Sequence, residues 1–341
     1  MIHIANILLT RRCNLSCSYC AIVKDYENKP KEYPDMLHYF ENEMSTQTVK
    51  NYLSRLKNHN PNIFCILYGG EPLVRKDIGE IVKFCNDNNI FYTIITNNSN
   101  SVQDTIKNLV FNNGSQLMGI TSSVDPVIMA KNYPNGDRYK KSIDGLKRLE
   151  YWKQFVDDAV AEITVDNETI DYLIPLVSSL TEKGISSSIT FIDIAKNPYY
   201  DFSNVTSEEL LVKQDDKVKE ILNELTDKKY DVHMAKVLMP KIYEILPSNM
   251  DCKIEKDFHN ITIDADGSIR LCLRIRGVET PKMGLCKYIN DDGKLNIDLY
   301  KNVTSDKKQY CEGCNWTCQI MSQAINENSN DIDKLIHTDR R

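Results

Sequence analysis

The chain has 341 residues, of which 41% are hydrophobic and 26% charged, and its formal net charge is −6. This length and balance are typical of a globular protein with one large α/β unit and a smaller module. The mild negative charge, with both signs scattered along the chain, argues against a nucleic-acid partner, which would need a basic face. No apolar run is long enough to span a bilayer, so we expect no membrane association either.

The chain contains eleven cysteines. Residues 1–10 are apolar but lack the basic leader and the cleavage site of a signal peptide, so we expect a cytoplasmic protein. Thiols stay reduced in that compartment, which argues against a disulfide framework. Metal binding is the better explanation for so many cysteines.

Short apolar runs alternate with helical patterns over roughly the first 195 residues. The helix expected at 46–58, for example, has an apolar stripe of Val49, Leu53 and Leu56, and Ser45 is placed to cap it. Six alternations predict an α/β fold with a parallel sheet and helices outside it. The expected strands are 2–9, 62–68, 90–96, 116–123, 158–165 and 186–193, and the expected helices are 46–58, 76–87, 101–112, 138–153 and 168–183.

The character of the chain changes in its last third. Residues 206–247 look helical and highly charged, and from Cys252 onward two strand-like pieces, 260–263 and 268–273, flank the turn signal Asp-Ala-Asp-Gly. We therefore expect four parts: a core at 1–200, a helical connector at 201–248, a small C-terminal domain at 249–322 and a polar tail at 323–341.

Three cysteines form a tight motif just after the first expected strand. Cys13, Cys17 and Cys20 have the spacing C-x3-C-x2-C, and Tyr19 precedes the last of them. Three thiolates can hold three irons of a 4Fe–4S cluster and leave the fourth iron open, which is typical of a reactive site. A zinc site with a remote fourth ligand is the alternative interpretation of this spacing alone.

The tetrapeptide Gly69-Gly70-Glu71-Pro72 ends the second expected strand. With the cysteine spacing, the aromatic residue and the β/α rhythm, it resembles the radical S-adenosylmethionine superfamily over roughly residues 1–195. The resemblance implies a partial (β/α)6 TIM-like barrel with S-adenosylmethionine chelated to the open iron. It also implies an external one-electron reductant of the flavodoxin or ferredoxin type.

The resemblance also assigns roles around the cofactor. Gly69 and Gly70 let the backbone approach its amino group, and Pro72 helps to hold the turn. Glu71 accepts from the ammonium or braces the loop. Tyr19 lies beside the adenine.

Matches after the later strands are less complete. Asn98 stands where the family commonly has glycine, and Pro126 replaces the glycine of a Ser-x-Asp-Gly motif. The alternatives are a plain turn after the third strand and a surface arginine at 138. The resemblance assigns the ribose to Thr96, Asn97 and Asn167, and the cofactor carboxylate to Ser123 and to Arg138, whose guanidinium suits a carboxylate.

Six cysteines lie between residues 252 and 318. Cys252 and Cys272 bracket the expected hairpin, and the run from Cys311 to Cys318 adds C-x2-C-x3-C. This arrangement resembles the SPASM or twitch extension of radical S-adenosylmethionine enzymes, a small C-terminal α+β domain. A structural zinc held by the same thiolates is the alternative.

The cysteine count favours one auxiliary 4Fe–4S cluster. Cys65 and Cys85 fall inside an expected strand and helix, where free cysteine usually acts as a small buried hydrophobe. The six that remain are too few for two fully ligated clusters. Cys286 has no obvious partner and is a spare thiol, an alternative ligand or a hydrogen-atom donor. The expected ligands are Cys252, Cys272, Cys311 and Cys314, with Cys318 competing for one place.

The resemblance implies a radical reaction. S-adenosylmethionine is cleaved reductively to methionine and a 5′-deoxyadenosyl radical, which removes a hydrogen atom from the substrate. The overall resemblance of the motifs to SPASM enzymes that modify peptides favours a peptide or protein side chain as substrate. The single-cluster count favours instead a twitch-type enzyme, a dehydrogenase or cyclase of a sugar, aminocyclitol or nucleotide. A third alternative is a non-enzymatic iron–sulfur or zinc protein, which would release no methionine.

Overall fold

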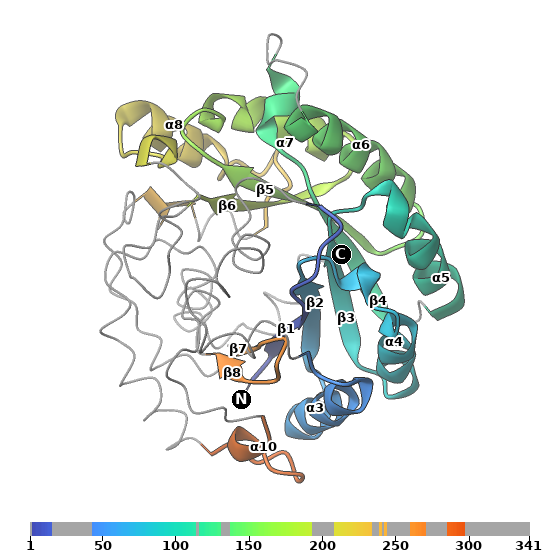
Figure 1. Cartoon of the computed structure of the whole chain (residues 1–341). Coiled ribbons are helices and arrows are strands. Elements are labelled where there is room, and N and C mark those ends of the chain that lie inside the picture. Colours follow the sequence, from blue (N-terminus) through green and yellow to red (C-terminus); the bar gives the residue numbers. More distant parts are fainter. Residues whose placement is uncertain are drawn as a thin grey trace, which may run out of the picture.

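The structure, a computed structural model, describes residues 2–15, 43–113, 116–130, 137–192, 208–233, 239–240, 242–243, 260–270 and 285–296. Its centre is an eight-stranded sheet in the order β6-β5-β4-β3-β2-β1-β7-β8. All neighbouring strands are parallel except the antiparallel pair β7–β8. Figure 1 shows the sheet curling, with the helices on its convex side. The predicted partial TIM-like barrel is thereby confirmed.

All six expected core strands are present. Their bounds differ from the sequence prediction by at most two residues, because the apolar runs that define them are nearly continuous, as buried parallel strands require. The strands are β1 (Ile4–Thr10), β2 (Phe64–Gly69), β3 (Phe91–Thr96), β4 (Leu117–Ser123), β5 (Asp158–Val165) and β6 (Ser186–Phe191).

The expected helices connect these strands. At the start of α3 the Ser45 hydroxyl accepts from the backbone N–H of Thr48 (3.1 Å), which confirms the predicted cap. The buried side chains of that helix are the predicted Val49, Leu53 and Leu56. The last helix differs from the prediction because a 3-10 turn, Ile170–Tyr172, precedes it. The helices are α3 (Thr46–His59), α4 (Ile78–Asp87), α5 (Gln103–Asn113), α6 (Asp137–Trp152) and α7 (Leu173–Glu182).

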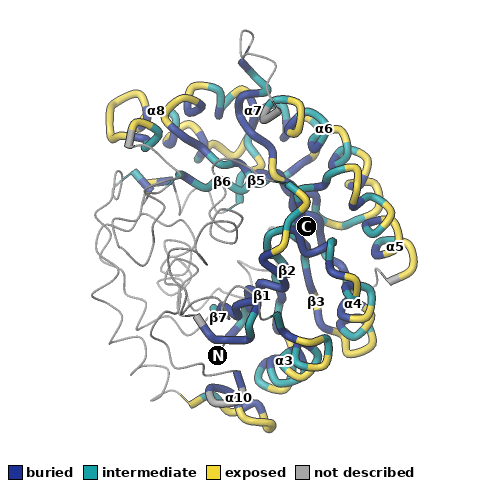
Figure 2. The backbone as a smooth tube through the Cα atoms, in the orientation of Figure 1, coloured by how far each residue is buried: buried dark blue, intermediate teal, exposed yellow. Residues whose placement is uncertain are grey.

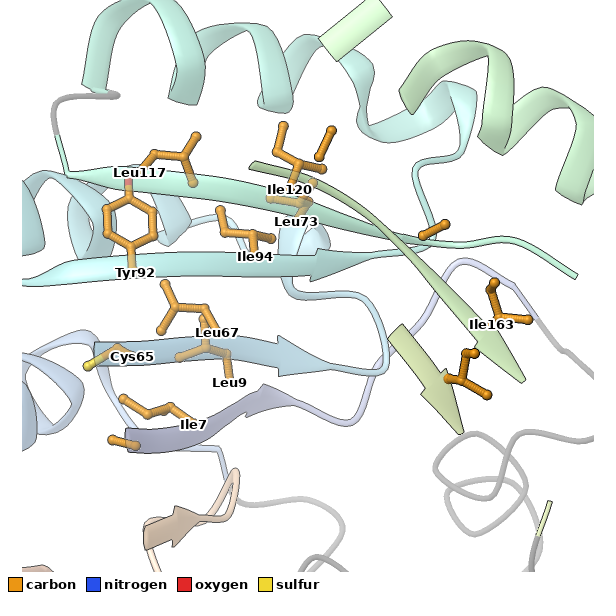
Figure 3. Close-up of a cluster of buried hydrophobic side chains, with 14 of the residues drawn as sticks. Ile7, Leu9, Cys65, Leu67, Leu73, Tyr92, Ile94, Leu117, Ile120 and Ile163 are labelled. Atoms are coloured by element: carbon orange, nitrogen blue, oxygen red, sulfur yellow. The ribbon is translucent and has the colours of Figure 1, made fainter. Parts of the chain in front are cut away.

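The core lies between the convex face of the sheet and the helix layer. Ile7, Leu67, Ile94 and Ile120 are paired across adjacent strands and are at most 2% exposed. Figure 3 shows this row of side chains, and Figure 2 shows that the burial follows the strands. Cys65 and Cys85 are also buried, as predicted for structural thiols.

The predicted hairpin is present as β7 (Asn260–Ile263) and β8 (Ile269–Arg270). Its turn uses Gly267 at φ +85°, a value that favours glycine. The hairpin is continuous with the barrel, because β7 pairs in parallel with β1 from Ile4↔Asn260 to Ile7↔Ile263. The boundaries of the four predicted parts stay a prediction.

Outside the sheet lie α8 (Asp216–Glu224), within the predicted connector, and the short α10 (Leu285–Tyr288). Asp215 caps α8, since its carboxylate accepts from the Val218 N–H (2.7 Å). Among the described parts of the chain, no helix has both the length and the apolar character needed to cross a membrane.

Candidate active site at the carboxyl ends of the strands

The carboxylate of Glu71 joins the ends of two strands. It follows β2 and accepts hydrogen bonds from the Leu73 N–H (3.0 Å), the Thr96 hydroxyl (3.0 Å) and the Asn97 N–H (2.7 Å) at the end of β3. Glu71 is fully buried. Burial raises its pKa, and the N–H donors of Asn97 and Leu73 and the Thr96 hydroxyl oppose that rise. These hydrogen bonds brace the loop, and a contact between Glu71 and the ammonium of the cofactor stays a prediction.

The two glycines before Glu71 allow β2 to lie against the end of β1. A Cβ on Gly69 would be 2.3 Å from the Thr10 oxygen, and one on Gly70 would be 2.4 Å from the Arg12 oxygen. The Gly70 N–H donates to the Thr10 oxygen (2.8 Å), and the Glu71 N–H to the Arg12 oxygen (2.9 Å). The close approach of the turn after β2 to residues 10–12 therefore requires both glycines, independently of any contact with a ligand.

Cys13 is held within this arrangement. Its sulfur accepts from the Leu15 N–H (3.4 Å) and from the side-chain amide of Asn97 (3.7 Å). That amide also donates to the Asn14 oxygen (2.8 Å), and Asn14 donates to the Ser99 hydroxyl (2.8 Å). Thiolate is the form of cysteine that binds iron, and N–H donors favour it, so the surroundings of Cys13 fit a cluster ligand.

The backbone after Asn97 explains one departure from the family pattern. Asn98 has φ +50°, a left-handed conformation that glycine adopts freely and that asparagine tolerates better than most residues. Its side chain is buried and donates to the Gly145 oxygen (3.3 Å). Asparagine therefore meets the same backbone requirement as the common glycine.

The turn after β4 accommodates the other departure. Pro126 is the first residue of a 3-10 helix, Pro126–Met129, where its fixed φ is favourable. Asp125 caps this helix, since its carboxylate accepts from the Val127 N–H (3.1 Å). Ser123, at the end of β4, is exposed. The loop therefore keeps a defined shape without the glycine.

For Asn167 and Arg138 the structure gives the position in the chain but describes no side-chain contact. Asn167 is exposed just after β5, and its backbone N–H donates to the Leu210 oxygen (2.9 Å). Arg138 is in the first turn of α6, and its side chain lies outside the described atoms. Cys286 lies in α10, and its side chain is likewise not described. The remaining predicted site residues lie outside the described residues: Cys17, Tyr19, Cys20, Cys252, Cys272, Cys311, Cys314 and Cys318.

Two buried arginines that sequence reasoning missed hold the segment around Cys13. Arg75 donates to the Leu9 oxygen (2.6 Å) and the Met44 oxygen (3.1 Å) and pairs with Asp77 (2.6 Å). The Arg75 hydrogen bond lowers the pKa of Asp77 to about 2. Arg11 forms a buried ion pair with Asp264 in the hairpin turn. Burial raises the pKa of Asp264 to about 7, against the opposing charge of Arg11.

A polar group that sequence reasoning also missed lies on the strand face opposite the core. Glu162 alternates along β5 with Ala161 and Ile163, which are buried in the core, so its side chain points to the concave side. The Thr190 hydroxyl on β6 donates to the Glu162 carboxylate (2.6 Å). Burial raises the pKa of Glu162, while hydrogen bonds from Thr190 and Ser188 lower it. A charged residue within an otherwise apolar alternation was the available signal.

Comparison with known proteins identifies the family. The profile described as the Radical SAM superfamily matches residues 7–194, more than half of the chain. The chain therefore belongs to the radical SAM superfamily, and it spans less than two thirds of the length of the Fe-coproporphyrin III synthase and of SuiB bound to S-adenosylmethionine, two proteins that it resembles. The family implies a 4Fe–4S cluster, S-adenosylmethionine and an external reductant.

Two proteins of known function are similar in sequence. The Fe-coproporphyrin III synthase of Methanosarcina barkeri is 34% identical over 90 residues, 26% of this chain and 19% of that protein. The GTP 3′,8-cyclase of Clostridium botulinum is 25% identical over 320 residues, 88% of this chain and 90% of that protein. These relatives act on different kinds of molecule, so they leave the substrate class of this chain open.

Solved structures of Streptococcus suis SuiB share the fold. One has a TM-score of 0.60 at 16% identity, covering 89% of this chain and 68% of SuiB. SuiB bound to S-adenosylmethionine has a TM-score of 0.54 at 15% identity, covering 88% of this chain and 64% of that one. At this identity the likeness shows the fold alone.

Proposed function

We propose that Cys13, Cys17 and Cys20 hold the 4Fe–4S cluster that binds S-adenosylmethionine, and that the enzyme removes a hydrogen atom from a peptide or protein side chain. The observation that carries this proposal is that Cys13, Asn97 and the glycine turn held by Glu71 lie together. They lie at the carboxyl ends of β1, β2 and β3. Ligands of parallel α/β folds bind at that edge.

The residues of this chain have distinct tasks in that reaction. Glu71 and the two glycines fix the backbone beside Cys13, and Asn97 orients the sulfur. Ser123 is the last residue of β4, Arg138 comes after β4 and Asn167 comes after β5. There Ser123 and Arg138 would face the cofactor carboxylate, and Asn167 would face the ribose. When bound, the cluster and S-adenosylmethionine supply the one-electron chemistry that generates the hydrogen-abstracting species.

We place the substrate against the concave face of the sheet. Glu162 and Thr190 lie there, on the opposite side of the strands from the core. A carboxylate flanked by hydroxyls suits a substrate with amide or ammonium donors, which peptides carry. Among proteins with this fold, SuiB has been solved bound to its precursor peptide SuiA.

An auxiliary cluster completes the proposal. Cys252, Cys272, Cys311 and Cys314, with Cys318 as competitor for one place, would hold one 4Fe–4S cluster in a SPASM- or twitch-like C-terminal segment. The hairpin between Cys252 and Cys272 pairs with β1, and its turn lies beside the segment that leads into Cys13, because Asp264 in that turn pairs with Arg11. Iron counting tests this part, since two clusters require about eight irons per chain and one requires about four.

A small nucleotide is the second candidate substrate. The observation in its favour is the GTP 3′,8-cyclase, whose similarity extends over 88% of this chain. The two candidates are separated by substrate deuteration. A deuterium that moves into 5′-deoxyadenosine from a peptide encoded beside the gene supports the first candidate, and transfer from deuterated GTP supports the second.

Replacing Cys17 tests the site of radical formation. After anaerobic reconstitution with dithionite as reductant, Cys17→Ala is expected to form no 5′-deoxyadenosine and to lose about four irons. Cys85→Ala is the matched control, because this cysteine is buried in the core, where burial raises its pKa well above the ordinary value. Turnover by the Cys17 variant at the wild-type rate would contradict the assignment.

A further inference from the structure

We propose that Asn97 is a positioning residue for the iron–sulfur cluster: its side-chain amide hydrogen-bonds the sulfur of Cys13 and makes the cluster easier to reduce. The inference rests on the proposed role of Cys13 as a cluster ligand. It gives Asn97 a task different from the ribose contact that the family resemblance assigns. The contact itself joins Asn97 Nδ2 and Cys13 Sγ at 3.7 Å, between the ends of β3 and β1.

The surrounding hydrogen bonds fix which end of the amide faces the sulfur. Asn97 Oδ1 accepts from the Ser99 backbone N–H (3.0 Å), so the NH2 group must be the end that faces Cys13. The second proton of that group goes to the Asn14 oxygen (2.8 Å). Both amide protons are therefore used within the protein.

The amide is also held in place at its backbone and at its partner. The Asn97 N–H donates to the buried Glu71 carboxylate (2.7 Å). Asn14 is fixed in turn by its bonds to the Ser99 hydroxyl (2.8 Å) and the Ser101 hydroxyl (2.5 Å). A donor held by this many contacts is preorganised, so it keeps its direction when the charge on the sulfur changes.

The physical consequence concerns the reduction potential. A ligating thiolate can only accept hydrogen bonds, and reduction by one electron adds negative charge to the iron and its sulfur ligands. An N–H aimed at the sulfur stabilises that added charge, so it raises the potential of the cluster. The Leu15 N–H at 3.4 Å acts in the same direction, but it belongs to the backbone. Asn97 is thus a side-chain donor, which a substitution can remove.

The experiment is a potentiometric titration of the full chain, reconstituted anaerobically and reduced with dithionite without S-adenosylmethionine, followed by electron paramagnetic resonance. The signal missing from Cys17→Ala identifies the N-terminal cluster. Asn97→Asp keeps the oxygen that accepts from Ser99 but replaces the donor. We expect its N-terminal cluster to titrate at a more negative potential, with the auxiliary cluster unchanged.

Asn100→Asp is the matched control. It adds the same charge in the same loop, at an exposed residue whose side chain accepts from Arg148 (2.8 Å). Solvent screens such a charge, so the midpoint should stay at the wild-type value. Asn14→Ser, which removes an acceptor that orients Asn97, is expected to give a smaller shift in the negative direction. It serves as the test if the Asn97 variant loses iron.

The outcomes separate this inference from the proposed function. Wild-type protein that takes up no iron and gives no signal with dithionite would overturn both. If Asn97→Asp takes up iron and its N-terminal cluster has the wild-type midpoint potential, the inference is overturned and the proposed function stands. If Asn97→Asp loses iron, the same result for Asn14→Ser overturns the inference. If Asn97→Asp binds S-adenosylmethionine more weakly but its cluster has the wild-type potential in the absence of S-adenosylmethionine, the ribose contact is the better assignment for Asn97.

Discussion

Replacing Glu71 with glutamine should weaken the link between β2 and β3. The carboxylate accepts two backbone N–H bonds, from Leu73 (3.0 Å) and Asn97 (2.7 Å). Hydrogen bonds to charged groups are worth about 1.5–3 kcal/mol each, and neutral ones about 1 kcal/mol. Glutamine keeps one acceptor and turns an NH2 group toward the other N–H.

The expected loss follows from these contacts. Two charged bonds of about 2 kcal/mol each become one neutral bond of about 1 kcal/mol, a loss of about 3 kcal/mol. The neutral amide recovers about 1 kcal/mol because burying it costs less than burying a carboxylate. We therefore expect the free energy of unfolding to fall by about 2 kcal/mol for Glu71→Gln at neutral pH.

The assay is urea unfolding of the full chain followed by circular dichroism. The matched control is Glu80→Gln on α4, whose carboxylate is 68% exposed and pairs with Lys50 (3.3 Å), so its loss should cost less than about 1 kcal/mol. Burial raises the pKa of Glu71, so the carboxylate should become protonated as the pH falls. A neutral carboxyl resembles the amide, so the free energies of unfolding of wild type and Glu71→Gln should then become more similar. Equal unfolding midpoints for the two variants at neutral pH would refute the brace.

Two further predictions concern the same end of the sheet. Gly70→Ala should destabilise the chain by about 1–3 kcal/mol and lower the iron content after reconstitution, because its Cβ would lie 2.4 Å from the Arg12 oxygen. Gly79→Ala in α4 is the control, because its Cβ would have no neighbour within 4 Å, and it should stabilise the helix by about 0.5–1 kcal/mol. A higher urea midpoint for Gly70→Ala than for Gly79→Ala would contradict the packing argument. Asp264 has a pKa raised from 3.8 to about 7, so the folded state holds a proton that the unfolded chain releases, and the free energy of unfolding should fall as the pH rises from about 4 to about 7. Asp264→Asn should remove this part of the slope in urea midpoints measured against pH, and an unchanged slope would count against a raised pKa.

The sequence was sufficient for the barrel because its signals are local. The apolar strands, the Ser45 cap and the Val49–Leu53–Leu56 stripe each depend on residues close together in the chain, and the structure reproduces them. The motif at 69–72 was found by its residue types. Its internal reason, the contact between Gly70 and Arg12, depends on two segments far apart in sequence and could not be derived from either one.

The rest of the candidate site required three-dimensional information for the same reason. Arg11 and Asp264 form a buried pair across 253 residues. The local sequence does not distinguish Arg75 from a loop arginine, because its bonds to the Leu9 and Met44 oxygens join segments that are far apart in the chain. Asn97 was recognised as a site residue, but its direction toward Cys13 is set by Ser99 and Asn14 together.

The pairing of β1 with β7 has a consequence for biosynthesis. Asn6 and Asn260, whose side chains are hydrogen-bonded across this pair (2.6 Å), are 254 residues apart. At about 5–20 residues per second, a ribosome needs roughly 10–50 s to deliver the second strand after the first. Until then β1 lacks one neighbour, and Arg11 lacks Asp264. The segment that leads into Cys13 therefore reaches its final contacts late in synthesis, after the hairpin of β7 and β8 has been made.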